Sequence, residues 1–195
     1  FIVQSTTFAL PKIFGERLQG LASRLVDWFQ VMDFPGHTDV ASTVGLFAFI
    51  VFAVASIAQL VVGGLLDRYG PRQIFMALAA LQIVFFLAMP GLHDGIALTV
   101  AFGFMLGAFG QIPINDFMIG KMASGTFRAR IYGIRYVVGF TVLAATLPLM
   151  AFVYENWGFD ILFRLLAGAA LVILAAVITL PKELPVRGEI TVAGT

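Results

Sequence analysis

Long apolar stretches constrain this chain more than any other feature of its sequence. The hydrocarbon core of a bilayer is about 30 Å thick, and an α-helix needs about 20 mostly apolar residues to cross it. Such stretches occur at residues 44–66, 73–90, 95–120, 131–154 and 159–180, and their few charges lie near their ends. Because a charge at the centre of a span costs about 2.5–3.5 kcal/mol, this pattern predicts five transmembrane helices in an all-α membrane protein.

The overall composition supports the same class of protein. Hydrophobic residues make up 60% of the 195 residues and charged residues 12%, with a mean hydropathy of +0.97. A soluble fold of this size could not remove so much apolar surface from water, so membrane lipids are the expected surroundings. The net charge of +1, without a basic stripe, argues against nucleic-acid binding.

Signals of enzymatic activity are absent from the sequence. There is no Cys, which excludes disulfides and thiol catalysis, and the two His residues have no ligands at metal-binding spacing. Nucleophile-elbow, zincin and Walker-type motifs are missing as well. We therefore expect neither an enzyme nor an ATP-driven pump, and no metal or cofactor.

The N-terminal third differs from the five spans. Residues 1–13 are apolar but too short to cross a membrane, and they are interpreted as the second half of a transmembrane helix that begins before this sequence. Residues 14–43 are expected to form an outer loop, with apolar residues at helical spacing: Phe14, Leu18, Leu21, Leu25 and Phe29. This spacing fits either an amphipathic helix on the membrane surface or an extension of the broken helix into a structured loop. Residues 181–195 are expected to form a flexible tail.

The connection between the first two spans carries the most specific motif. Residues 63–72 read Gly-Gly-Leu-Leu-Asp-Arg-Tyr-Gly-Pro-Arg. This resembles the signature cytoplasmic loop of the major facilitator superfamily, G-x-L-x-D-R-x-G-[RP]-[RK]. The matching positions are Gly63, Leu65, Asp67, Arg68, Gly70 and Arg72, whereas Pro71 replaces the commoner Arg. The resemblance extends over the whole chain in helix count, loop lengths and charge pattern.

The resemblance implies a particular fold and function. The chain would be the six-helix C-terminal half of a twelve-helix transporter, helices 7–12, with its first helix truncated and with an N-terminal half as its missing partner. Such a protein moves a small solute by secondary active transport with alternating access. The alternative from another class is a small six-helix membrane scaffold or a homo-oligomeric channel.

The residue types of the signature loop predict a helix contact, a chain reversal and a set of charges at the membrane edge. Gly63 and Gly64 would allow close contact with another helix, while Gly70 with Pro71 would reverse the chain. Asp67 and the two arginines lie at the membrane edge, where they can meet opposite charges.

A second acidic residue lies near the same face of the membrane. Asp116 falls about one turn inside the end of its span, where a carboxylate is costly unless it is paired. Its candidate partners are Arg68, Arg72, Arg128 and Arg130. The resemblance implies a gating network of these charges with Asp67, while the alternative that Asp116 reaches headgroup water alone stays open.

Residues that could contact a solute are harder to identify. Gln4 and Thr7 share a face of the broken helix, and Gly107 and Gln111 share a face of the third full span. These four residues are the candidates for a substrate cavity, although a glycine spacing of this kind more often indicates helix packing. No charged residue lies at the centre of a span, so no countercharge for a substrate or coupling ion is evident.

The distribution of Lys and Arg predicts the orientation in the membrane, because cytoplasmic loops carry an excess of both. Connections 67–72 and 121–130 and the tail contain arginines, whereas connections 91–94 and 155–158 contain neither Lys nor Arg. The arginine-bearing connections and the C-terminus should therefore lie in the cytoplasm, in a multi-pass protein of the plasma (inner) membrane.

Single-cysteine labelling can test this orientation, because the sequence has no native Cys. We expect Gly70→Cys and Gly125→Cys to react only with a thiol reagent on the cytoplasmic side. Gly91→Cys and Asn156→Cys should react from outside. Labelling of Gly91→Cys from the cytoplasmic side alone would contradict the assignment.

Overall fold

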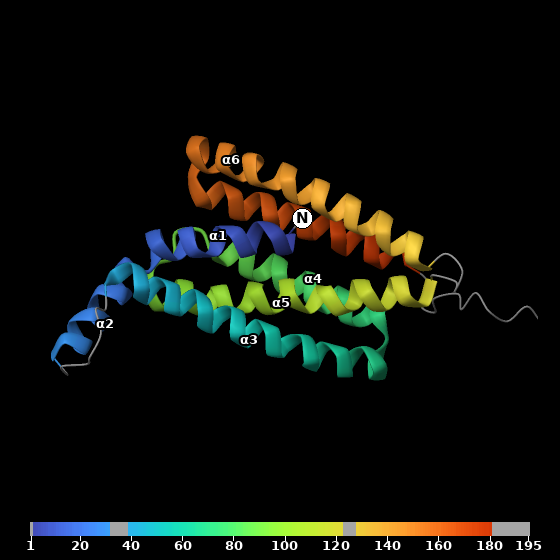
Figure 1. The fold of residues 1–195 in the computed structure, drawn as a ribbon, viewed down its shortest axis with the longest axis horizontal. Helices are drawn as coiled ribbons and strands as arrows, with labels where there is room; N and C mark the ends of the chain where they lie inside the picture. The colour runs from blue at the N-terminus through green and yellow to red at the C-terminus, as the bar shows by residue number, and fades with distance from the viewer. Residues whose placement is uncertain (1, 32–38, 123–127, 181–195) are drawn as a thin grey trace, which may run out of the picture.

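The computed structural model describes residues 2–31, 39–122 and 128–180, and the regular structure in these ranges is entirely α-helical. Figure 1 shows the order of the helices along the chain. Their bounds are α1 (Ile2–Arg17), α2 (Gln19–Val31), α3 (Val40–Tyr69), α4 (Pro71–Ala88), α5 (Asp94–Met122) and α6 (Arg128–Ile178). The predicted all-α fold class is confirmed.

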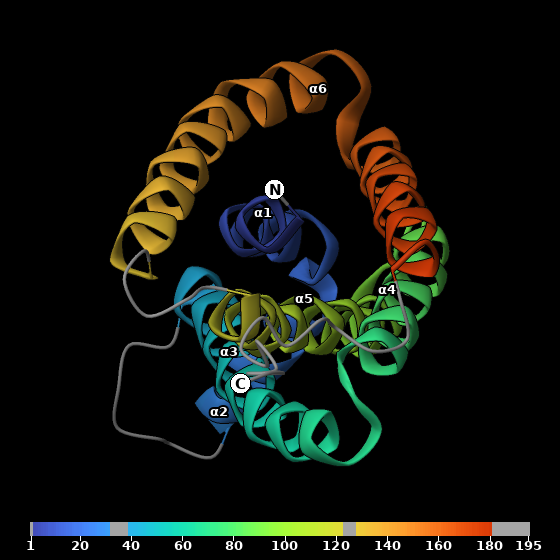
Figure 2. The same ribbon diagram turned by 90° about the vertical axis from the view of Figure 1, so that its right-hand side faces the viewer.

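Four of these helices, α3 to α6, are long and apolar enough to cross a membrane. Helix α6 has 51 residues, more than twice the length of a span, and it is interrupted at Gly158. The backbone there has φ 73° and ψ −175°, in a region that favours glycine. Gly158 therefore divides α6 into two arms that run back in opposite directions (Figure 1) and diverge from this elbow, one on each side of α1 (Figure 2). Helices α3, α4 and α5 and the two arms correspond to the five predicted spans.

The N-terminal segments are more helical than the sequence suggested. Helix α1 continues past residue 13 to Arg17, and α3 begins at Val40 rather than at residue 44. Helix α2 lies between them and packs against α3 and α5, with Ala22 and Val26 buried. Most of the predicted loop at 14–43 is thus helix. Residues 32–38, the connection around Gly125 and the tail 181–195 lie outside the described ranges.

Helix α1 lies at the centre of the bundle. Figure 2 shows it enclosed by the other helices, and it packs against α3, α5 and α6. Two of its polar side chains bond to their own helix: the Thr6 hydroxyl donates to the Ile2 carbonyl (2.9 Å) and the Thr7 hydroxyl to the Val3 carbonyl (2.7 Å), whereas the buried Ser5 hydroxyl has no partner among the described residues. These bonds explain how a polar segment can be buried among apolar neighbours.

Three phenylalanines form an aromatic cluster in the core. Phe86 of α4, Phe104 of α5 and Phe163 of the second α6 arm are at most 1% exposed. Their ring centroids lie 5.3, 5.7 and 6.3 Å apart, within the range of favourable aromatic pairing. This cluster fixes the second arm of α6 against α4 and α5.

Arg17 joins three elements at the end of the bundle opposite the signature loop. Its side chain is 13% exposed and donates to the Asp160 carboxylate (2.5 Å) and to the Leu92 carbonyl (3.3 Å). Asp160 also accepts from the Gly91 N–H (3.2 Å). The end of α1, the α4–α5 connection and the elbow of α6 are therefore held by one guanidinium and one carboxylate.

Removing the Arg17 side-chain charge should weaken the whole bundle. Because Asp160 is partly exposed, we expect Arg17→Met to lower the free energy of unfolding by only about 1–2 kcal/mol. This loss should appear as a lower thermal unfolding temperature in detergent. Arg24→Met, which removes an exposed arginine of the neighbouring α2, is the matched control. Equal unfolding temperatures for the two variants would contradict the joining role of Arg17.

Candidate functional site: the signature turn and the pocket at Arg135

The signature loop, residues 63–72, contains the turn between α3 and α4, which we call the signature turn. A single residue links the two helices. Helix α3 ends at Tyr69 and α4 begins at Pro71, with Gly70 between them at φ 81° and ψ 160°. The Gly70 N–H donates to the Leu66 carbonyl (3.0 Å) and so satisfies one of the last acceptors of α3. Pro71 occupies the first position of α4, where its missing N–H costs nothing. Gly70 and Pro71 thus make the chain reversal that their spacing predicted.

The expected close helix contact at Gly63 and Gly64 is wrong for the described residues. A Cβ added at either position would meet no atom within 4 Å. Close approach occurs instead on α5, where a Cβ at Gly107 would lie 2.7 Å from Cγ of Gln82. The glycine pair of α3 faces outward because α3 packs on α5 through other positions, such as the buried Val62 and Leu66.

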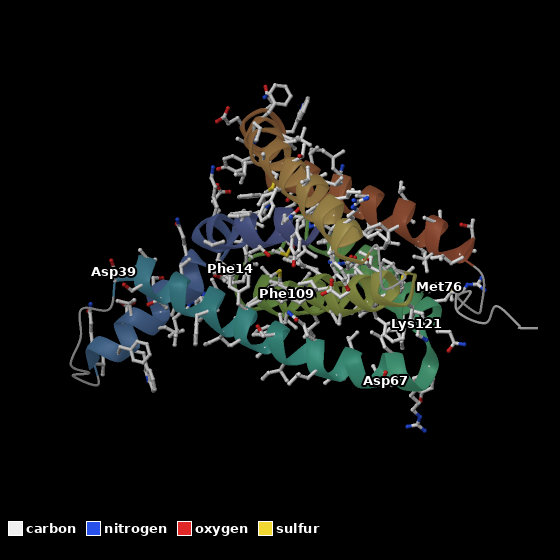
Figure 3. The ribbon with its side chains drawn as sticks, turned by 45° about the vertical axis from the view of Figure 1, so that its right-hand side comes forward. Phe14, Asp39, Asp67, Met76, Phe109 and Lys121 are labelled. Carbon is white, nitrogen blue, oxygen red and sulfur yellow. The ribbon has the colours of Figure 1, made fainter. Side chains whose placement is uncertain are left out.

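The charges of the signature turn are spread over the surface. Asp67 and Arg68 are exposed, and the Arg68 guanidinium lies 5.4 Å from the centre of the Tyr69 ring. Arg72 donates to the Ile178 carbonyl (2.8 Å) and so ties the start of α4 to the end of α6. Figure 3 shows Asp67 and Lys121 at the same end of the bundle, at the ends of α3 and α5. Asp67 forms no ion pair with any residue that the structure describes.

The structure gives Asp116 a partner that was not among those predicted. Its carboxylate forms an ion pair with Arg135 of the first α6 arm, and its backbone carbonyl accepts from the Tyr132 hydroxyl (3.4 Å). Arg130 is exposed in the first turn of α6, and the side chain of Arg128 lies outside the description. Asp116 is therefore joined to a residue that the sequence placed within a span, not to the arginines of the signature turn.

Arg135 was missed as a site residue, although the sequence contained a signal. Asp116 precedes the end of α5 by about two turns, and Arg135 follows the start of α6 by about two turns. Two successive antiparallel helices bring such positions to the same depth. An acidic and a basic residue at matched depths therefore indicate a pair.

A pocket of about 690 Å³ opens beside this ion pair, between α1, α5 and the first arm of α6. Its polar lining residues are Gln4, Asn115 and Arg135, and the rest of its wall is aliphatic apart from Gly139. The Gln4 side chain donates to the Gly139 carbonyl across the pocket at 3.5 Å. A smaller pocket of about 260 Å³ shares Gln4, Arg135 and Gly139. Of the four predicted cavity residues, Gln4 lines this pocket.

Gly107 and Gln111 lie elsewhere, in the interface between α4 and α5. Gln111 Nε2 donates to Gln82 Oε1 at 2.7 Å, and both side chains are at most 3% exposed. Gly107 packs directly on the Gln82 side chain. Thr7 is bonded to its own helix and is not among the residues that line the pocket. The structure thus separates a polar helix interface from the pocket, which sequence spacing could not do.

The fold and the site together define a class of protein: a multi-pass integral membrane protein with antiparallel helical spans and a one-residue signature turn. A family model of the Major Facilitator Superfamily matches residues 18–193. The chain therefore belongs to the major facilitator superfamily, whose members are membrane transport proteins. Among curated proteins and solved structures, no match was found.

The buried Gln82–Gln111 pair can be tested by separate and joint replacement. Gln82 Nε2 has no hydrogen-bond partner in the described structure, so Gln111→Met would leave the whole Gln82 amide unpaired. We expect a loss of about 1–2 kcal/mol in the free energy of unfolding. The double replacement Gln82→Met and Gln111→Met should recover most of this loss, because it leaves no buried amide. Additive losses would contradict the pairing, and Gln73→Met at an exposed position is the control.

Proposed function

We propose that this chain acts in secondary active transport of a small solute by alternating access, together with a second six-helix half. The observation that carries the proposal is the signature turn, in a chain that belongs to a family of transporters. Its Asp67 and Arg68 are exposed at one end of the bundle. They are therefore placed where a second half could meet them as the two halves rock.

The outer surface of the bundle supports the same proposal. Large apolar side chains are exposed along α3 and along the first arm of α6, among them Phe49, Leu60, Val137 and Phe140. Exposed apolar side chains grouped on one face of a membrane protein contact lipid or another protein. On this proposal, the faces of these two elements are divided between lipid and the second half.

The proposed orientation places the signature turn in the cytoplasm. Its arginines lie at the same end of the bundle as the end of α6, because Arg72 bonds to Ile178. The C-terminus would then be cytoplasmic as well, in a plasma (inner) membrane. Arg17 and Asp160 would lie at the outer end.

An uptake assay with a neutralised signature turn tests this function. In cells that co-express the chain with a complementary six-helix half, a labelled solute library is screened for saturable uptake. We expect Asp67→Asn to lower the maximal rate by about tenfold with KM little changed, because the turn would govern rearrangement and not binding. Asp27→Asn, an exposed carboxylate of α2, is the matched control.

Two other uptake results would favour the channel or the scaffold over a transporter half. Saturable, solute-specific uptake by the purified chain alone in liposomes would contradict the need for a second half and favour a homo-oligomeric channel. A scaffold would show no uptake in either setting.

A further inference from the structure

The pocket between α1, α5 and the first α6 arm has the dimensions of a small-molecule site. Its volume of about 690 Å³ lies within the range of about 300–1,000 Å³ for ligand pockets. Its aliphatic wall comes mainly from α5 and α6, with Ile112, Ile134, Val138 and Val142, and includes Val3 of α1. An aliphatic wall with a few convergent polar groups favours a ligand that is itself mostly apolar.

Arg135 supplies the charge of this pocket. It lies about two turns inside its helix and lines both the larger and the smaller pocket. It lies about one turn inside the predicted span 131–154, where an ionisable residue is costly unless it is paired and indicates a functional site. Its side chain is 32% exposed, and one of its terminal nitrogens, Nη1, bonds to Asp116. A guanidinium has five N–H donors in a planar fork and can bind a second carboxylate through its other edge.

We propose that this pocket binds a small organic monoanion with an apolar body, its carboxylate on Arg135 and its body against the aliphatic wall. This inference rests on the proposed transport function and names the substrate class of that function. Gln4 and Asn115 line the same pocket, and each amide nitrogen has one N–H beyond the bond that it already donates, to the Gly139 carbonyl and to the Gln111 carbonyl. Asp116 is then the competing anion, since it already occupies one edge of the same guanidinium.

Other classes of solute fit the pocket less well. A polyol would gain little from the aliphatic wall, which offers its hydroxyls no hydrogen-bond partner. A cation would meet Arg135, and no acidic residue is among those that line the pocket. The nearby carboxylate of Asp116 does not offer a cation an unpaired charge, because it is already paired with Arg135, and its side chain is 49% exposed.

A binding experiment tests the proposal without requiring transport. The purified chain is placed in phosphatidylcholine nanodiscs, and the affinities for benzoate, benzamide and benzylamine are measured by calorimetry. We expect benzoate to bind and its neutral and cationic counterparts to bind at least tenfold more weakly. Equal binding of benzamide and benzoate would overturn the proposal.

Variants test which charged residue binds benzoate. Arg135→Gln should weaken benzoate binding at least tenfold, and Arg135→Lys should retain part of it because the charge remains but the planar fork is lost. Asp116→Asn should strengthen it severalfold by removing the competing carboxylate. Lys121→Gln removes a cation at the same end of α5 that does not line the pocket, and it should leave the affinity within about twofold.

The remaining outcomes distinguish the possible failures. If Arg135→Gln does not fold, Asp116→Asn decides: unchanged or weaker benzoate binding overturns the proposal. If nanodiscs containing phosphatidylglycerol block benzoate in the wild type, the pocket is a lipid-headgroup site and the proposal fails. If benzoate binds as expected but no solute is taken up by co-expressing cells, the transport function fails and the anion site stands.

Discussion

The absence of water in the hydrocarbon core is the constraint on which this structure depends. Within that layer every backbone polar group must find a partner in the protein, and an α-helix provides these partners inside each segment. Charged side chains are then confined to the helix ends, where they join neighbouring elements. Arg17 does so at one end of the bundle with Asp160, and Arg72 and Arg135 do so at the other.

Between the ends, the helices are held mainly by close packing, because lipid is as apolar as a leucine side chain and gives little hydrophobic driving force. Helix α5 shows how this is achieved. Its Gly107 admits the side chain of Gln82, whose oxygen accepts from Gln111. The outward-facing glycines of α3 have no such neighbour in the bundle. Gly107 of α5 therefore serves packing inside the bundle, whereas the glycines of α3 lie on a face that no other described helix covers.

Much of the fold could be predicted from the sequence because hydropathy reports directly on the bilayer. The five spans and the reversal at Gly70 followed from stretch length and from the special backbone needs of glycine. The end of α1 was misjudged because Glu16 and Arg17 look like loop residues. In the structure Arg17 is still part of α1 and bonds to Asp160, a partner that lies 143 residues away in sequence.

The candidate site was less predictable, for a related reason. Hydropathy gives the depth of a residue but not the direction that its side chain faces. Gln4 lines the pocket and Gln111 faces α4, yet both are single polar residues in apolar helices. The Asp116–Arg135 pair depends on how two antiparallel helices align, which a family motif restricted to the signature loop does not report.

The single-residue connection at Gly70 has a mechanical consequence. A linker of one residue has no slack, so a tilt of α3 is transmitted directly to the first turn of α4. The bond from Arg72 to Ile178 passes the same displacement on to the end of α6. At this end of the bundle, we therefore expect α3, α4 and the second arm of α6 to move together.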